Sequence, residues 1–269
     1  MQINQLLTPY NFTAGTIHRI KYIVIHYVGA TGGAEANCKY YAAQNRGASA
    51  HYFVGFAGEI WQAVEDKNIA WHCGGKKYAN TKGGIYHGIC TNGNSIGIEM
   101  CVRNRGSKAD NSRDWYFEDA TVKATIELTK ALMQKYSVPA DHVIRHYDVT
   151  GKICPNPYVM DEEKWKQFKA AIAAPQQEPR WVKDDKGWWY QNADGTWPKS
   201  EWRLINHHWY LFGANGYIRK GWHRWNPDTK QVDPDDGSGD WYYLQETGDL
   251  EGACWHGTEK GSLEIWHIK

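Results

Sequence analysis

Apolar and polar positions alternate along the first two thirds of the chain in short runs that predict strands. Residues 21–27 form a β-branched and aromatic run typical of a buried strand, and residues 95–102 alternate as a second sheet strand does. Residues 51–56 and 59–64 are shorter strand-like runs on either side of Ala57-Gly58, a sequence that favours a hairpin. The pattern therefore predicts a sheet that includes at least one antiparallel pair.

Helical periodicity separates these runs. Residues 34–45 look helical, residues 117–136 carry apolar side chains at helical spacing, and residues 161–173 predict a final helix. A short strand is expected at 142–145, between the last two helices. Strands interspersed with helices predict an α/β fold, with a central mixed β-sheet flanked by helices.

The composition changes near residue 174. Residues 174–180 are small, polar and proline-bearing, as in a linker, and 11 of the 15 Trp residues lie at or beyond Trp181. We therefore expect a first domain at 1–173, a linker at 174–180 and a second domain at 181–269.

The second domain contains an internal repeat. Trp and Gly recur at intervals of seven, at Trp181, Trp188, Gly195, Trp202, Trp209 and Gly216, and again at Trp241, Gly248 and Trp255. A period near 21, built of aromatic strands and Gly turns, predicts a small all-β hairpin-repeat solenoid. Some of these rings form its core, and rings with open faces suit a quaternary ammonium group.

Charge and hydropathy exclude several functional classes. The net charge is +1 with no basic cluster, so no nucleic-acid partner is expected. No apolar run approaches the ~20 residues of a transmembrane helix. The first residues lack a basic leader and an apolar core, so we expect cytoplasmic synthesis without a signal peptide. The six cysteines form no compact framework and are expected to be free thiols.

Three residues have the character of metal ligands: His26 at the end of the first buried strand, then His146 and Cys154. Zinc binds imidazole and thiolate, and three protein ligands leave the fourth position that a catalytic site needs. With 12 His and 6 Cys, the residue types alone leave other triples open. The weaker alternative is a second site built from Cys73, Cys90 and Cys101 with His72 or His87.

Several motifs, in a fixed order along the chain, resemble those of a known family of zinc enzymes. They are Ile23-Val-Ile-His-Tyr, Ser49-Ala-His-Tyr-Phe-Val-Gly with Gly58-Glu-Ile-Trp-Gln-Ala-Val, Ala70-Trp-His-Cys-Gly, Asn94-Ser-Ile-Gly-Ile-Glu99, and Arg145-His146 with Lys152-Ile-Cys-Pro155. Together they resemble the zinc-dependent N-acetylmuramoyl-L-alanine amidases of the type-2 amidase family. That family includes phage lysozyme-like amidases and peptidoglycan recognition proteins.

The resemblance implies a role for each matching residue. His26, His146 and Cys154 match the ligands of one Zn²⁺, Glu99 matches a general base, and Lys152 matches the position that stabilises the oxyanion. Some members carry Tyr where this chain has Ala50, so the departure favours the variant that depends on glutamate.

Two further histidines are expected near the substrate. His51 lies in the predicted hairpin and is expected beside the metal site or against substrate. His72 lies in the motif that lines the family's groove, and we expect it to contact substrate.

The second domain resembles the choline-binding, cell-wall-binding repeats found on many lysins. Gly187-Trp-Trp-Tyr-Gln-Asn-Ala-Asp-Gly195 and Asp240-Trp-Tyr-Tyr-Leu-Gln-Glu-Thr-Gly248 carry the resemblance. By that analogy the candidate cage residues are Trp189, Trp202, Trp209, Trp222 and Trp241. Leu211 replaces an aromatic of the usual pattern, so the ligand is either choline or another teichoic or lipoteichoic-type wall polymer.

The expected activity is hydrolysis of the amide between N-acetylmuramic acid and L-alanine in peptidoglycan, as in a phage endolysin that reaches the wall through holin-type export or lysis. The main alternative is a non-catalytic peptidoglycan recognition protein, although Cys154, which some of those proteins lack, favours activity. A wall-adhesion protein and a glycosidase are further alternatives, and the glycosidase would need paired carboxylates and no metal.

Overall fold

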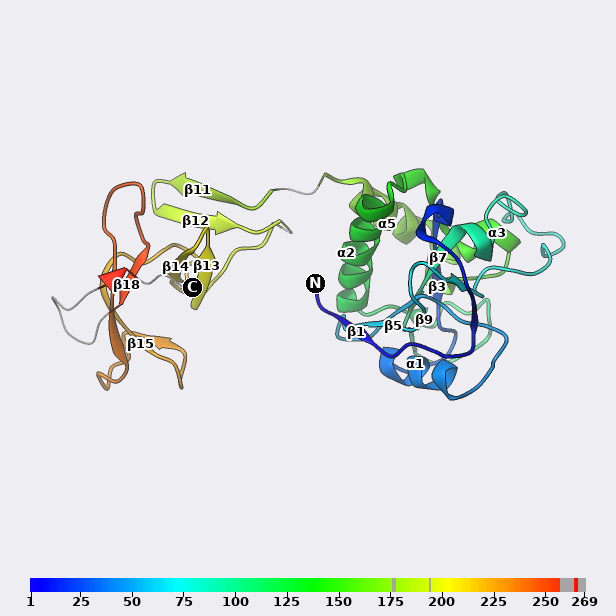
Figure 1. Ribbon diagram of the computed structural model, residues 1–269, viewed down its shortest axis with the longest axis horizontal. Helices are drawn as coiled ribbons and strands as arrows, with labels where there is room; N and C mark the ends of the chain where they lie inside the picture. Colours follow the sequence, from blue (N-terminus) through cyan, green and yellow to red (C-terminus); the bar gives the residue numbers. More distant parts are fainter. Residues whose placement is uncertain (176–177, 194, 257–263, 266–269) are drawn as a thin grey trace. The chain divides into compact units, whose positions relative to one another are not determined.

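The computed structural model describes residues 1–175, 178–193, 195–256 and 264–265. The chain forms two compact units, Met1–Ala174 and Pro175–Lys269 (Figure 1). The expected linker, 174–180, contains residues 176 and 177, which lie outside the described residues, and Arg180 already begins the first strand of the second unit. No helix among the described residues has the length and apolar character needed to cross a membrane.

A six-stranded mixed sheet forms the centre of the first unit. Its order is β1 (Ile3–Gln5), β5 (Ile60–Gln62), β4 (Tyr52–Val54), β7 (Ser95–Met100), β3 (Tyr22–Tyr27) and β10 (Val143–Arg145). Strands β4 and β5 pair antiparallel, and the other neighbouring pairs are parallel. The predicted hairpin is confirmed, with Gly58 in its turn at a φ of +86°, a conformation that favours glycine.

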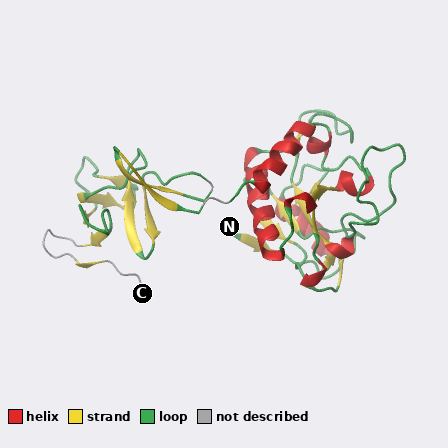
Figure 2. Ribbon diagram, turned by 90° about the horizontal axis from the view of Figure 1, so that it is seen from above, coloured by secondary structure: helices red, strands yellow, loops and turns green. Residues whose placement is uncertain are grey.

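The central strands are apolar on both faces because helices and loops cover both. Every residue of β3 is buried, which explains its continuous apolar sequence. On one face, Ile23 and Ile25 pack in the same core as Leu128 and Phe168. Those two residues come from α2 (Asp119–Tyr136) and α5 (Glu162–Ala173), which pack against each other (Figures 1 and 2).

The opposite face is covered by α1 (Ala34–Ala43), whose Cys38 packs with Phe53 of β4. The three predicted helices and the predicted strands are thus confirmed, with ends shifted by a few residues. Two short helices were not predicted: α3 (His146–Thr150) and α4 (Asn156–Val159).

Small elements complete the first unit. Two strand pairs and three 3-10 turns lie outside the main sheet. The strand pairs are β2 (Phe12–Thr13) with β6 (Ile69–Ala70), and β8 (Arg103–Asn104) with β9 (Trp115–Tyr116). The turns are η1 (Ile17–Arg19), η2 (Asn92–Asn94) and η3 (Ala140–His142).

The described part of the second unit is all β. Two hairpins pair β11 (Arg180–Asp184) with β12 (Gly187–Gln191) and β13 (Glu201–Ile205) with β14 (His208–Phe212). A further sheet has the order β16 (Gln231–Val232), β15 (Gly221–Asn226), β17 (Asp240–Leu244), β18 (Cys254–His256) and β19 (Glu264–Ile265). Aromatic and aliphatic residues of the second unit form two small cores, one that includes Phe212 and one that includes Leu211.

Candidate metal centre

Three buried side chains meet at the C-terminal ends of strands β3 and β10 of the main sheet. His26 lies near the end of β3, and His146 follows β10 directly, at the start of α3. Because β10 pairs parallel with β3, with Arg145 opposite Ile25, the two histidines lie beside each other. Cys154 completes the group from the loop after α3, and the three ligand atoms all lie within 4.8 Å of one another.

The spacing fits a zinc ion. Cys154 Sγ lies 3.6 Å from His26 Nδ1. Zinc–nitrogen and zinc–sulfur bonds of about 2.0 and 2.3 Å at a tetrahedral angle place the two ligand atoms about 3.5 Å apart. The ring centroids of His26 and His146 are 4.7 Å apart, so both imidazoles are within reach of the same ion.

Burial sets the protonation of these ligands. It lowers the pKa of His26 well below its usual value, with further lowering from the nearby His146, His72 and Lys152, and it lowers the pKa of His146 to about 3. Both rings are therefore neutral, the form that binds metal. Burial also raises the pKa of Cys154, so its thiolate needs a cation beside it. Two neutral imidazoles and a thiol that ionises beside a cation are therefore consistent with a zinc site.

Glu99 joins the group from the neighbouring strand. Residue 99 of β7 pairs with residue 26 of β3, and Glu99 Oε1 lies 3.9 Å from His26 Nδ1. Its other oxygen, Oε2, is buried and has no hydrogen-bond partner among the described residues. Burial raises the pKa of Glu99 to about 8, and the positive charge of Lys152 partly opposes this shift. A carboxyl group with such a pKa can accept and return a proton near neutral pH.

Lys152 is exposed and lines a cavity of about 390 Å³ that begins at His146. Two other lysines, Lys76 and Lys77, line the same cavity. The cavity therefore presents positive charge next to the metal ligands, where an anion or a polarised carbonyl would be stabilised.

The two other predicted histidines occupy different environments. His51 is fully buried, and its ring nitrogens are bonded to the backbone: Gly97 N–H donates to Nδ1 at 3.0 Å, and Nε2 lies 3.1 Å from Asn68 O. Its nitrogens are therefore not offered to a substrate. His72 is half-buried, and its Nδ1 lies 3.0 Å from His26 Nε2, on the side of His26 that faces away from Cys154.

Sequence reasoning missed the residues that orient α3. Asp148 accepts from the Arg145 backbone N–H at 2.8 Å, and it accepts two more bonds from the Arg145 guanidinium, at 3.0 and 3.1 Å. Arg145 also reaches Glu162 of α5. An acidic residue at the third position of a helix is a recognised capping signal. Asp148 holds this position in α3, so the signal was visible in the sequence.

Comparison with known proteins agrees with this geometry. The profile of the N-acetylmuramoyl-L-alanine amidase family matches residues 16–157, more than half of the chain and all of the residues of the candidate centre. The chain belongs to this amidase family.

Individual relatives support the assignment. The chain is similar to BlyA, an N-acetylmuramoyl-L-alanine amidase of Bacillus subtilis (strain 168), with 33% identity over 162 residues that cover 58% of this chain and 41% of BlyA. It is 30% identical over 181 residues to the amidase CwlL of Bacillus licheniformis, covering 64% and 45% of the two chains. The matches thus span less than half the length of either relative.

The fold is also known. The solved structure of PlyL matches with a TM-score of 0.52 and 22% identity, over 65% of this chain and 98% of that chain. At this identity the likeness concerns the fold, and it confirms an amidase-like α/β fold with a central mixed sheet.

In the second unit, the five predicted cage tryptophans lie in three environments. Trp202 and Trp209 pack against the core around Leu211. Trp222 and Trp241 pack edge to face, with ring centroids 6.2 Å apart and planes at 81°, and the Arg224 guanidinium lies over Trp241. Trp189 lines a cavity of about 190 Å³.

That small cavity has the features of a ligand site. Trp189 and Trp197 form two of its walls, with ring centroids 5.9 Å apart and planes at 70°. Tyr217 and Asp184 lie in the same cavity, hydrogen-bonded to each other at 2.8 Å. Aromatic faces beside a carboxylate suit a small organic cation.

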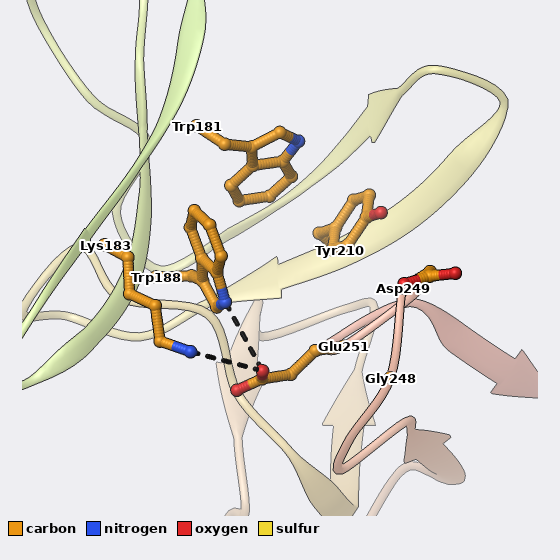
Figure 3. Close-up of a pocket in the computed structure, with 7 residues that line it drawn as sticks. All are labelled: Trp181, Lys183, Trp188, Tyr210, Gly248, Asp249 and Glu251. Carbon is orange, nitrogen blue, oxygen red and sulfur yellow. Dashed lines mark hydrogen bonds and ion pairs between the residues drawn. The ribbon is translucent and has the colours of Figure 1, made fainter.

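A larger cavity of about 380 Å³ lies between the first hairpin, Tyr210 of β14 and the loop before β18 (Figure 3). The Glu251 carboxylate accepts from Trp188 Nε1 at 3.3 Å and pairs with Lys183 and Lys220. Trp181, another lining residue, already packs against Tyr210 and Phe212. The groups of this cavity are thus mainly engaged with one another.

Proposed function

We propose that the protein is a zinc-dependent N-acetylmuramoyl-L-alanine amidase that hydrolyses the amide between N-acetylmuramic acid and L-alanine in bacterial peptidoglycan. The observation that carries this proposal is the buried set of His26, His146 and Cys154, with Glu99 on the adjacent strand. Family membership, rather than fold alone, supports the choice of reaction.

Each residue has a distinct task. His26, His146 and Cys154 would hold the metal, which would supply Lewis-acid polarisation of the scissile carbonyl and of water. Glu99, whose carboxyl group lies beside the ligand His26, takes a proton from the attacking water and returns it to the departing amine. Lys152 stabilises the negative charge that develops on the carbonyl oxygen. The cavity lined by Lys152 and His146 receives the substrate beside these groups.

The first unit is the catalytic domain in this proposal, and the second anchors it to the wall. The hairpins and aromatic cavities of the second unit suit repeated weak binding of a wall polymer, as in a repeat solenoid. A choline-bearing teichoic acid is the ligand that the Trp189 cavity favours, because its quaternary ammonium matches the aromatic walls.

The decisive experiment is digestion of purified Gram-positive walls by the full chain, with and without a chelator, followed by analysis of the new chemical ends. We expect new L-alanine amino groups without new reducing sugars, lost with chelator and restored by zinc. The variant Cys154→Ser should give little product and bind less zinc.

New reducing sugars would instead identify a glycosidase and reject the assigned site. Tight wall binding without any release of material would make the protein a recognition protein.

A further inference from the structure

A chain of hydrogen bonds leads from the candidate metal centre into the protein. His26 Nε2 lies 3.0 Å from His72 Nδ1, and His72 Nε2 lies 3.2 Å from Ser95 Oγ. Ser95 Oγ in turn donates to the backbone carbonyl of Thr91 at 2.6 Å. Two groups, the His72 imidazole and the Ser95 hydroxyl, thus connect the metal-binding ring to a fixed carbonyl oxygen.

The carbonyl determines the direction of every bond in this chain. A carbonyl oxygen can only accept, so the single hydroxyl proton of Ser95 is directed at Thr91. Ser95 Oγ is then free only to accept, and it accepts from His72 Nε2–H. A neutral imidazole that carries its proton on Nε2 has a lone pair on Nδ1. His72 Nδ1 therefore accepts from His26 Nε2–H.

The consequence reaches the metal ligands. With its proton on Nε2, His26 has a bare lone pair on Nδ1, the nitrogen that lies 3.6 Å from Cys154 Sγ. We propose that His72 and Ser95 are positioning residues that fix the tautomer of His26 and so prepare its Nδ1 to bind zinc. This inference rests on the zinc site of the proposed function. Ligand histidines commonly donate their second N–H to a carboxylate or a carbonyl, and here an imidazole and a hydroxyl stand between the ligand and the carbonyl.

The surrounding backbone is built to hold His72 in this place. A Cβ on Gly97 would lie 2.6 Å from His72 Cγ and 2.7 Å from His72 Nδ1, so the ring occupies the space that a side chain at residue 97 would need. The backbone N–H groups of His72 and Cys73 both donate to Asn92 Oδ1, at 3.0 and 2.8 Å. The space beside Gly97 and the hydrogen bonds to Asn92 therefore together fix the position of the His72 ring.

The test uses the full chain and four variants. His72→Ala and Ser95→Ala break the chain at successive links, whereas His72→Asn keeps an acceptor near the position of Nδ1. Thr129→Val is the matched control, because it removes a buried hydroxyl that has no partner among the described residues. Zinc affinity is measured by competition with a chromophoric chelator, and histidine tautomers by long-range ¹H–¹⁵N correlation on the metal-free protein.

We expect His26 of the natural chain to show the Nε2–H pattern, and His72→Ala to show a mixture of tautomers. His72→Ala and Ser95→Ala should lower the zinc affinity about 10- to 100-fold. His72→Asn should restore it to within a few-fold, and Thr129→Val should leave it unchanged.

The inference is overturned if His72→Ala, shown to be folded by circular dichroism, keeps both the tautomer and the zinc affinity of the natural chain. It is also overturned if Thr129→Val weakens zinc binding as much as Ser95→Ala does. Neither readout needs substrate. A natural chain with the expected tautomer and zinc affinity that leaves peptidoglycan intact would therefore reject the proposed function and support the positioning role.

Discussion

Glu99 and His26 occupy paired positions on the parallel strands β7 and β3, and Glu99 Oε1 lies 3.9 Å from His26 Nδ1. Side chains at paired positions point to the same face of a sheet, so the register itself brings the carboxylate to the metal ligands. Both strands lie inside the sheet rather than at its edges, which gives the two groups a rigid support.

Replacing Glu99 by Gln should separate chemistry from metal binding. The amide cannot accept the proton, so we expect kcat to fall about 10²- to 10⁴-fold while zinc content stays near one per chain. Activity on soluble muropeptides and metal analysis of the purified variant check this. Glu163→Gln on the exposed surface of α5 is the control. Retention of most activity would remove Glu99 from the mechanism.

The same variant should change how the stability of the metal-free protein depends on pH. Burial raises the pKa of Glu99 to about 8, above its usual value near 4.5, so the folded state favours the protonated form. The unfolded chain loses this proton first, and stability falls as pH rises between these values. Urea unfolding at several pH values should show a smaller decline in Glu99→Gln than in the natural chain. Equal slopes for both proteins would contradict the raised pKa.

Lys152→Ala should reduce kcat about 10²- to 10³-fold with little change in zinc affinity, because the lysine stabilises charge that is present only in the transition state. The comparison is with Lys166→Ala, which removes an exposed lysine on α5. An effect confined to KM would instead assign Lys152 to substrate binding.

Gly97→Ala should disturb the metal centre although residue 97 binds no metal. The added methyl would lie 2.6 Å from His72 Cγ, so the ring must move, and overpacking of this kind costs about 1–3 kcal/mol. We expect a lower melting temperature and weaker zinc binding. Gly93→Ala is the matched control, because its Cβ meets nothing closer than 3.5 Å. A fully stable Gly97→Ala protein would show that the ring can relocate without cost.

Trp189→Ala should weaken binding to choline-bearing walls while hydrolysis of soluble muropeptides is unchanged, since the residue lies in the second unit. Sedimentation of the protein with walls, in the presence and absence of free choline, measures this. Leu204→Ala removes an exposed apolar side chain of the same unit and serves as the control. Unaltered wall binding would exclude the Trp189 cavity as the anchoring site.

The sequence predicted the parts of the fold that carry strong local patterns. Strand β3 is a continuous apolar run because both of its faces are buried. Helix α2 is amphipathic because only one of its faces is buried. The position of His26 near the end of β3 and of His146 just after β10 followed from these elements. Their closeness depends on the parallel pairing, which the sequence alone does not specify.

Features that depend on tertiary register escaped prediction. The α3 helix has only five residues, too few for a periodic pattern. Gly97 looked like one small residue in an alternating strand, and only the structure shows that His72 occupies the space beside it. His51 was expected near the metal or the substrate, and its bonds to Gly97 and Asn68 became visible only when the sheet was assembled.

The two ends of the metal site are far apart in the chain: His26 and Cys154 are separated by 128 positions. An ion held by both therefore closes a loop that includes most of the first unit, and it does so reversibly, unlike a disulfide. An ion that binds only the folded chain stabilises it by about 2.7 kcal/mol at a free concentration 100 times its dissociation constant. Free zinc would then determine how long the folded state lasts as well as the proposed activity, and wherever zinc is scarce the protein would lose both together.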